Sequence, residues 1–139
     1  MTVQMVLLPV FVQVALTFAL LFWMASVRRG SVSRGETKIR DIALGQPNWP
    51  DQPTQISNSY NSQFQVPLLF YVVVILAWIT RQADAVFVVL EWLFVLLRIG
   101  HAYVHTTSNY VPTRFKIFAA GIFVLLIMWV YSAFKILTA

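Results

Sequence analysis

The chain has 139 residues, of which 59% are hydrophobic and 11% charged, with a formal net charge of +5 and no cysteine. A soluble domain of this size cannot bury so much apolar surface, so the composition predicts a membrane protein. The lack of cysteine excludes disulfides, thiolate metal sites and a cysteine nucleophile. The positive charge does not indicate nucleic-acid binding, because the basic residues lie next to apolar segments, where they set membrane topology.

Four segments meet the length requirement for a membrane helix, which is about 20 mostly apolar residues. They cover about 3–27, 57–80, 85–105 and 115–137. The first has no basic region before its apolar run and no small-residue cleavage site, so we expect a retained helix rather than a signal peptide. The sequence therefore predicts an all-α integral membrane protein, with residues 1–139 forming a single four-helix bundle.

The connections between these segments are short except for one. Arg81–Asp84 and Ser108–Thr113 are tight turns, so the segments that they join should run antiparallel. Residues 28–56 form the long loop, in which Pro47, Pro50 and Pro53 argue against a regular helix.

The distribution of basic residues predicts the orientation in the membrane. Only Arg81 and Lys135, of 10 Lys and Arg residues, lie on the side opposite the long loop. By the positive-inside rule the long loop is cytoplasmic and both termini lie on the other side, which we expect in a bacterial inner membrane. The basic residues on the cytoplasmic side are Arg28, Arg29, Arg34, Lys38, Arg40, Arg98, Arg114 and Lys116.

The third segment carries ionisable residues within apolar sequence. Glu91, Arg98, His101 and His105 fall within an arc of roughly 80° on one helical face. Ionisable groups at membrane depth are energetically unfavourable in lipid, so they face protein or a wet cavity and often mark function.

The second segment has a matching polar face at its cytoplasmic end. Asn58, Asn61, Ser62 and Gln65 lie within an arc of roughly 100°. Because the two segments form a hairpin, both polar faces reach the cytoplasmic leaflet and can line one pocket. Amides and cations in such a pocket suit a polar, anionic ligand next to a bilayer that supplies a lipophilic one.

Structural interpretations of the same residues compete with this one. Glu91 and Arg98 are two helical turns apart and can belong to an ion-pair network between helices, and the amides can simply join helices by hydrogen bonds. His101 and His105 have the i,i+4 spacing that can chelate a metal, but without a third ligand we predict no metal site.

Two local patterns, together with the four-span plan, resemble the MAPEG family, membrane-associated proteins of eicosanoid and glutathione metabolism, and suggest a divergent bacterial-type member. In "NSQFQVPLLF", Asn61 and Pro67 resemble part of the family's second-helix motif, Arg-x-Gln/His-x-Asn-x-x-Glu-x-x-Pro. In "WLFVLLRIGHAYVHTTSNYVPTRFK", Arg98 is followed by His101 and His105, where many members carry tyrosine after the third-helix Arg.

The resemblance implies a homotrimer that holds glutathione between subunits near the cytoplasmic side. It implies Arg114 as the catalytic group that stabilises the glutathione thiolate, and a lipophilic second substrate that enters from the membrane lipids. This would make the protein a glutathione-dependent transferase or peroxidase. The implied ligand-binding residues are Asn58, Asn61, Gln65, Arg98, His101 and His105.

The second-helix motif is incomplete in this chain. Its Arg, Gln/His and Glu positions are occupied by Ser57, Ser59 and Phe64. These differences motivate an alternative, in which the fold serves as a non-catalytic accessory or scaffold subunit of a larger membrane complex, or as a lipid-binding subunit.

Overall fold

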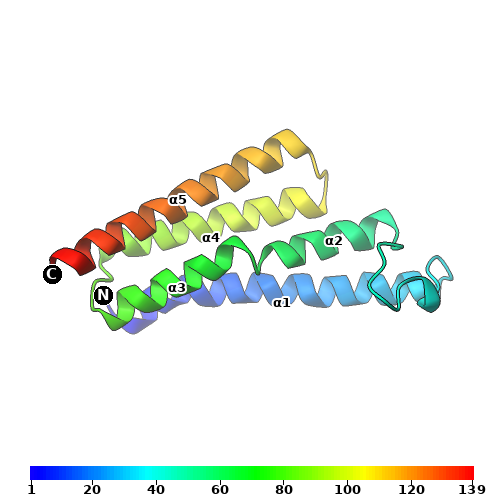
Figure 1. Ribbon diagram of the computed structural model, residues 1–139, viewed down its shortest axis with the longest axis horizontal. Helices are drawn as coiled ribbons and strands as arrows, with labels where there is room; N and C mark the ends of the chain where they lie inside the picture. Colours follow the sequence, from blue (N-terminus) through cyan, green and yellow to red (C-terminus); the bar gives the residue numbers. More distant parts are fainter.

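The computed structural model describes residues 1–139 and is entirely helical (Figure 1). Four of its segments are long and apolar enough to cross a membrane. The predicted all-α, four-helix membrane bundle is therefore confirmed. The helices are α1 (Val3–Ser33), η1 (Ile39–Asp41), α2 (Asp51–Ser62), α3 (Val66–Ile79), α4 (Ala85–Thr106) and α5 (Val111–Thr138).

Neighbouring long helices alternate in direction, so both termini lie at one end of the bundle (Figure 1). We call this the terminal end, and we call the opposite end, which carries residues 34–50 and the α4–α5 turn, the loop end. α1 has 31 residues and is about 46 Å long, whereas the apolar core of a bilayer is about 30 Å thick. It therefore extends beyond the predicted 3–27 span.

The second crossing segment consists of two helices, α2 and α3, and begins at Asp51, earlier than predicted. Pro50 and Pro53 do not prevent this start, because a proline in the first turn of a helix removes no intrahelical hydrogen bond. Helix α2 therefore starts directly after Pro50 and includes Pro53, within the segment predicted to be loop.

A break at Gln63–Gln65 separates α2 from α3. Pro67 has no N–H to continue the ladder and lies in the first turn of α3, while Gln65 adopts a non-helical conformation with φ −96° and ψ −96°. The Gln63 side chain stabilises the break, because its amide nitrogen donates to the Ser59 carbonyl at 2.9 Å. Its oxygen accepts from the buried Gln13 amide of α1 at 2.8 Å, which fixes the break against α1.

The hydrophobic core lies between α1, α3, α4 and α5. Phe70 of α3 stacks on Phe94 of α4, with ring centroids 4.7 Å apart and both side chains fully buried. Val6 of α1 and Met128 of α5 complete the contact of four helices. This core fixes the depth at which α4 presents its polar residues.

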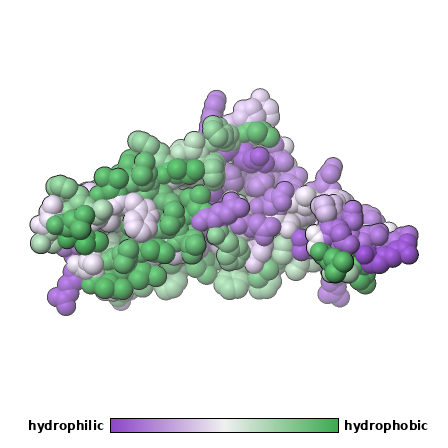
Figure 2. Space-filling view, viewed as in Figure 1, coloured by the Kyte–Doolittle hydropathy of each residue, from purple (hydrophilic) through white to green (hydrophobic).

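The two ends of the bundle differ in polarity. On the face of the molecule that Figure 2 shows, apolar residues cover most of the half toward the terminal end. Polar residues dominate the half toward the loop end. At the terminal end, the Asp84 carboxylate caps α4 by accepting from Phe87 N at 3.0 Å. Asp84 also accepts from Tyr131 and, at 2.6 Å, from Lys135 of α5. These contacts clamp the α3–α4 turn to α5.

Candidate functional site

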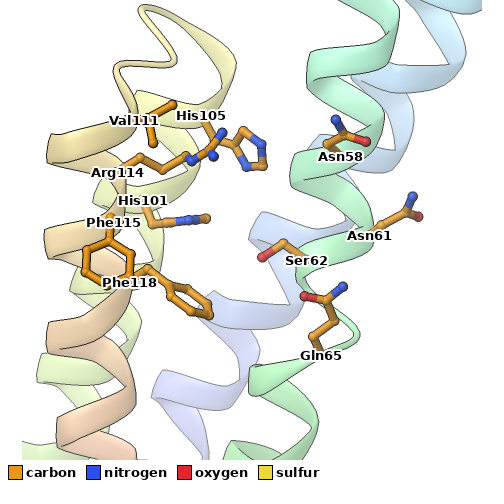
Figure 3. A pocket seen from close by; sticks show the side chains of 10 residues that line it. All are labelled: Asn58, Asn61, Ser62, Gln65, His101, His105, Val111, Arg114, Phe115 and Phe118. Carbon is orange, nitrogen blue, oxygen red and sulfur yellow. The ribbon is translucent and has the colours of Figure 1, made fainter.

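A cavity of about 510 Å³ lies between α2 and the α4–α5 pair (Figure 3). This volume is within the range of small-molecule sites. Six of the seven predicted site residues line the cavity: Asn58, Asn61, Gln65, His101, His105 and Arg114. Ser62, which belongs to the predicted polar face of the second segment, also lines it, whereas Val111, Phe115 and Phe118 were not predicted from the sequence.

The two histidines form one wall of the cavity. His101 and His105 lie one turn apart on α4, with their rings edge to face and their centroids 5.3 Å apart. Both are largely buried, and the Nδ1 atom of each is buried without a hydrogen-bond partner. Unpaired buried polar atoms are uncommon in folded proteins, so these two nitrogens are an unusual feature of this part of α4.

Arg114 projects from the first turns of α5 toward His105 (Figure 3). Its guanidinium donates to the Asn109 side-chain oxygen at 2.5 Å. Asn109 lies in the α4–α5 turn with φ +50°, a left-handed conformation that Asn tolerates better than most residues. The turn thus orients Arg114, which lines the cavity.

Arg98 is the predicted site residue that does not line the cavity. It is 2% exposed, and its guanidinium donates to Ser62 Oγ at 2.8 Å, which joins α4 to α2 behind the cavity wall. Arg98 therefore contributes positive charge near the cavity but makes its direct contact with protein. Ser62 belongs to the predicted polar face of α2, and its hydroxyl supplies this contact.

The amide side of the cavity is more open. Asn58, Asn61 and Gln65 are exposed in a single chain, although they lie on one of the segments that can cross a membrane. At the loop end, Gln55 of α2 donates to the Thr107 carbonyl at 3.0 Å. This bond joins α2 to the α4–α5 turn at the loop end.

The three positions that depart from the second-helix motif are occupied in different ways. Ser57 accepts a hydrogen bond from Arg28 of α1 at 2.8 Å, so a guanidinium from another helix lies at this position. Ser59 is fully buried and its hydroxyl has no partner. Phe64 is 57% exposed and packs edge to face on Tyr60.

Glu91 lies apart from the cavity. It is fully buried on α4, and neither carboxylate oxygen has a hydrogen-bond partner or an ion pair within the chain. Within the chain, Glu91 and Arg98 do not form the ion pair considered from the sequence, and Arg98 contacts Ser62. The chain also has no group of three or more His, Cys, Asp or Glu side chains arranged to hold a metal.

Comparison with known proteins identifies a family. The MAPEG family model matches residues 6–134, which is nearly the whole chain. The match covers all of the residues that line the cavity and most or all of each of the four membrane-type segments. No curated protein and no solved structure matched the chain. The chain therefore belongs to the MAPEG family.

Proposed function

We propose that the cavity binds glutathione or a closely related anionic thiol, and that the protein is a glutathione-dependent transferase or peroxidase for lipophilic substrates. The observation that carries this proposal is the composition of the cavity wall. Arg114 and two histidines face three side-chain amides, and no carboxylate lines the cavity. Such a wall favours a negatively charged ligand with several hydrogen-bonding groups.

Arg114 would stabilise the thiolate of the bound thiol. A thiol with a pKa of about 8.5 must lose about 1.5 units to ionise at neutral pH, which corresponds to about 2 kcal/mol. A guanidinium 4 Å from the sulfur contributes about 4 kcal/mol at an effective dielectric constant of 20. One arginine is therefore sufficient. The thiol proton passes to water as the thiolate forms. In the transferase reaction the sulfur then attacks the electrophile, and the leaving group departs with the bonding electron pair.

The surroundings of the cavity support a lipophilic second substrate and a multimeric site. Phe115 and Phe118 line the cavity beside Arg114 and offer an apolar surface next to the thiol. Exposed amides such as Asn61 and Gln65 are unfavourable against lipid. We infer that a second copy covers them in a homotrimer, as is common in this family, and that the loop end faces the cytoplasm.

The proposal is tested by adding glutathione to the purified protein in detergent and recording ultraviolet difference spectra. We expect a saturable thiolate band, together with conjugation of an electrophile. Arg114→Met should reduce the thiolate fraction at neutral pH about tenfold or more. Lys116→Met removes a nearby charge that does not line the cavity and is the matched control.

The absence of a thiolate band in the wild-type protein, or equal spectra for the two variants, would contradict the proposal. The second candidate, an accessory or lipid-binding subunit, is favoured by the exposed apolar Phe64 at the motif Glu position. It predicts glutathione-independent co-purification with a membrane complex instead.

A further inference from the structure

Another cavity, of about 500 Å³, lies at the terminal end of the bundle, between the start of α1 and the turn that follows α3. Arg81 contributes the one charged side chain of its wall, and no carboxylate side chain lines it. The other lining residues are Met1, Trp78, Ile79 and Ala83. The cavity therefore combines a guanidinium with a mostly apolar wall.

Arg81 has an unusual backbone conformation for its residue type. Its φ is +59°, in the left-handed region, directly after the C-cap of α3. Arg81 N donates to the Trp78 carbonyl at 3.1 Å, and Gln82 N donates to the Ala77 carbonyl at 2.9 Å. These are the two bonds of a Schellman cap, in which glycine usually occupies the left-handed position because it has no Cβ. A strained residue of this kind often belongs to a functional site.

The turn that carries Arg81 is anchored to α5. Lys135 Nζ donates to the Gln82 carbonyl at 3.1 Å and to the Asp84 carboxylate at 2.6 Å. Tyr131 also donates to Asp84. Together with the Schellman bonds, these contacts hold the backbone on both sides of Arg81. The guanidinium therefore projects from a fixed position at the terminal end.

Arg81 is also the unpaired basic side chain of this end. The other basic side chain of the terminal end, Lys135, forms an ion pair with Asp84. Arg81 forms no ion pair within the chain, and Asp84, the acidic residue nearest to it in sequence, is already occupied. The charge of Arg81 is therefore available to an anion from outside the chain.

The position of the cavity indicates which anion it takes. Trp78 and Ile79 are 39% and 68% exposed in the last turn of a segment that can cross a membrane. Tryptophan and arginine at the end of such a segment lie at the level of the lipid headgroups. Arginine binds phosphate through two parallel N–H groups. A headgroup ammonium, by contrast, would find no carboxylate in this wall.

We propose that Arg81 and Trp78 form a binding site for an anionic phospholipid in the leaflet opposite the long loop. The lipid phosphate lies on the Arg81 guanidinium, and an acyl chain follows the apolar surface of Ile79. The bound lipid accounts for an arginine where glycine would be less strained. This site goes beyond the proposed function, because it requires neither the main cavity nor a thiol.

The test measures lipid binding and unfolding of the full chain in a neutral detergent. Native mass spectrometry compares the binding of phosphatidylglycerol with that of phosphatidylcholine, and unfolding by a denaturing detergent is followed with and without each lipid. We expect a saturable site that prefers phosphatidylglycerol at least tenfold and stabilises the protein when it is filled.

Arg81→Gly removes the guanidinium and relieves the left-handed strain. It should weaken phosphatidylglycerol binding at least tenfold, while the lipid-free variant is no less stable than the wild type. If the glycine variant does not fold, Arg81→Asn tests the same point, because asparagine also tolerates this conformation. Lys38→Asn removes an equal charge from an exposed position at the loop end and should leave the preference for phosphatidylglycerol unchanged.

Equal affinities for the two lipids, or equal lipid binding by the wild type and Arg81→Gly, would overturn the proposal. Inorganic phosphate provides the soluble arm, and stabilisation by phosphate equal to that by phosphatidylglycerol would contradict a lipid site. The proposed thiolate function fails separately, because the Arg114 spectra can be negative while the effect of Arg81→Gly on lipid binding persists.

Discussion

Removing the Ser62 hydroxyl should destabilise the bundle, because this group is the one hydrogen-bond acceptor of the buried Arg98 guanidinium. Ser62→Ala leaves that charge without a protein partner at a position where Arg98 is 2% exposed. Interhelical hydrogen bonds in membranes contribute about 0.6 kcal/mol on average and about 1.7 kcal/mol at most. Hydrogen bonds to charged groups contribute about 1.5–3 kcal/mol. We expect a loss of about 1.5 kcal/mol, or roughly tenfold in the unfolding equilibrium.

The assay is unfolding of the detergent-solubilised protein by a denaturing detergent, followed by helical circular dichroism. Ser132→Ala is the matched control, because Ser132 is 3% exposed on α5 and its hydroxyl has no hydrogen-bond partner. Its removal should be neutral or slightly stabilising. Equal stability of Ser62→Ala and wild type, or equal losses in both variants, would refute the assignment of Ser62 as the partner of Arg98.

Three further predictions follow from contacts elsewhere in the chain. Partial burial raises the pKa of Asp84, but its hydrogen bonds, led by the one from Lys135, outweigh this effect and lower the pKa to about 2. The ionised Asp84 therefore stabilises the fold above pH about 4, which is its pKa in the unfolded chain. This stabilisation is lost as the pH falls through about 2. Thermal unfolding in detergent should show this loss in wild type and not in Asp84→Asn. Gln55→Ala should increase proteolysis at the α4–α5 turn by removing the bond to Thr107, whereas the exposed Gln52→Ala should not. Glu91→Met should leave unfolding stability unchanged or raise it by about 1 kcal/mol, because the carboxylate has no partner in the chain, and a clear loss would point to a partner on another chain.

The membrane segments could be predicted from sequence because their length and apolar composition leave few alternatives. The clustering of His101 and His105 with Asn58 and Asn61 could also be predicted, since hairpin topology brings the polar ends of the two segments to one depth. The start of α2 at Asp51 could not, because a proline has different consequences in the first turn and in the interior of a helix.

Contacts between distant segments were less accessible from the sequence. Nothing near Arg28 indicates that it donates to Ser57, and the choice of Ser62 rather than Glu91 as the neighbour of Arg98 depends on how the helices are rotated. The roles of Phe115 and Phe118 were missed because aromatic residues at the start of a membrane helix are usually interfacial anchors. Their position beside Arg114 was the one available signal.

An experimental density map of the protein, solved with glutathione present, would test the central claim most directly. We predict ligand density in the cavity between α2 and the α4–α5 pair, with the sulfur near the Arg114 guanidinium and polar contacts to His105 and Asn61. A cavity that contains only a lipid headgroup, or that is filled by side chains of a neighbouring subunit, at saturating glutathione would contradict the claim.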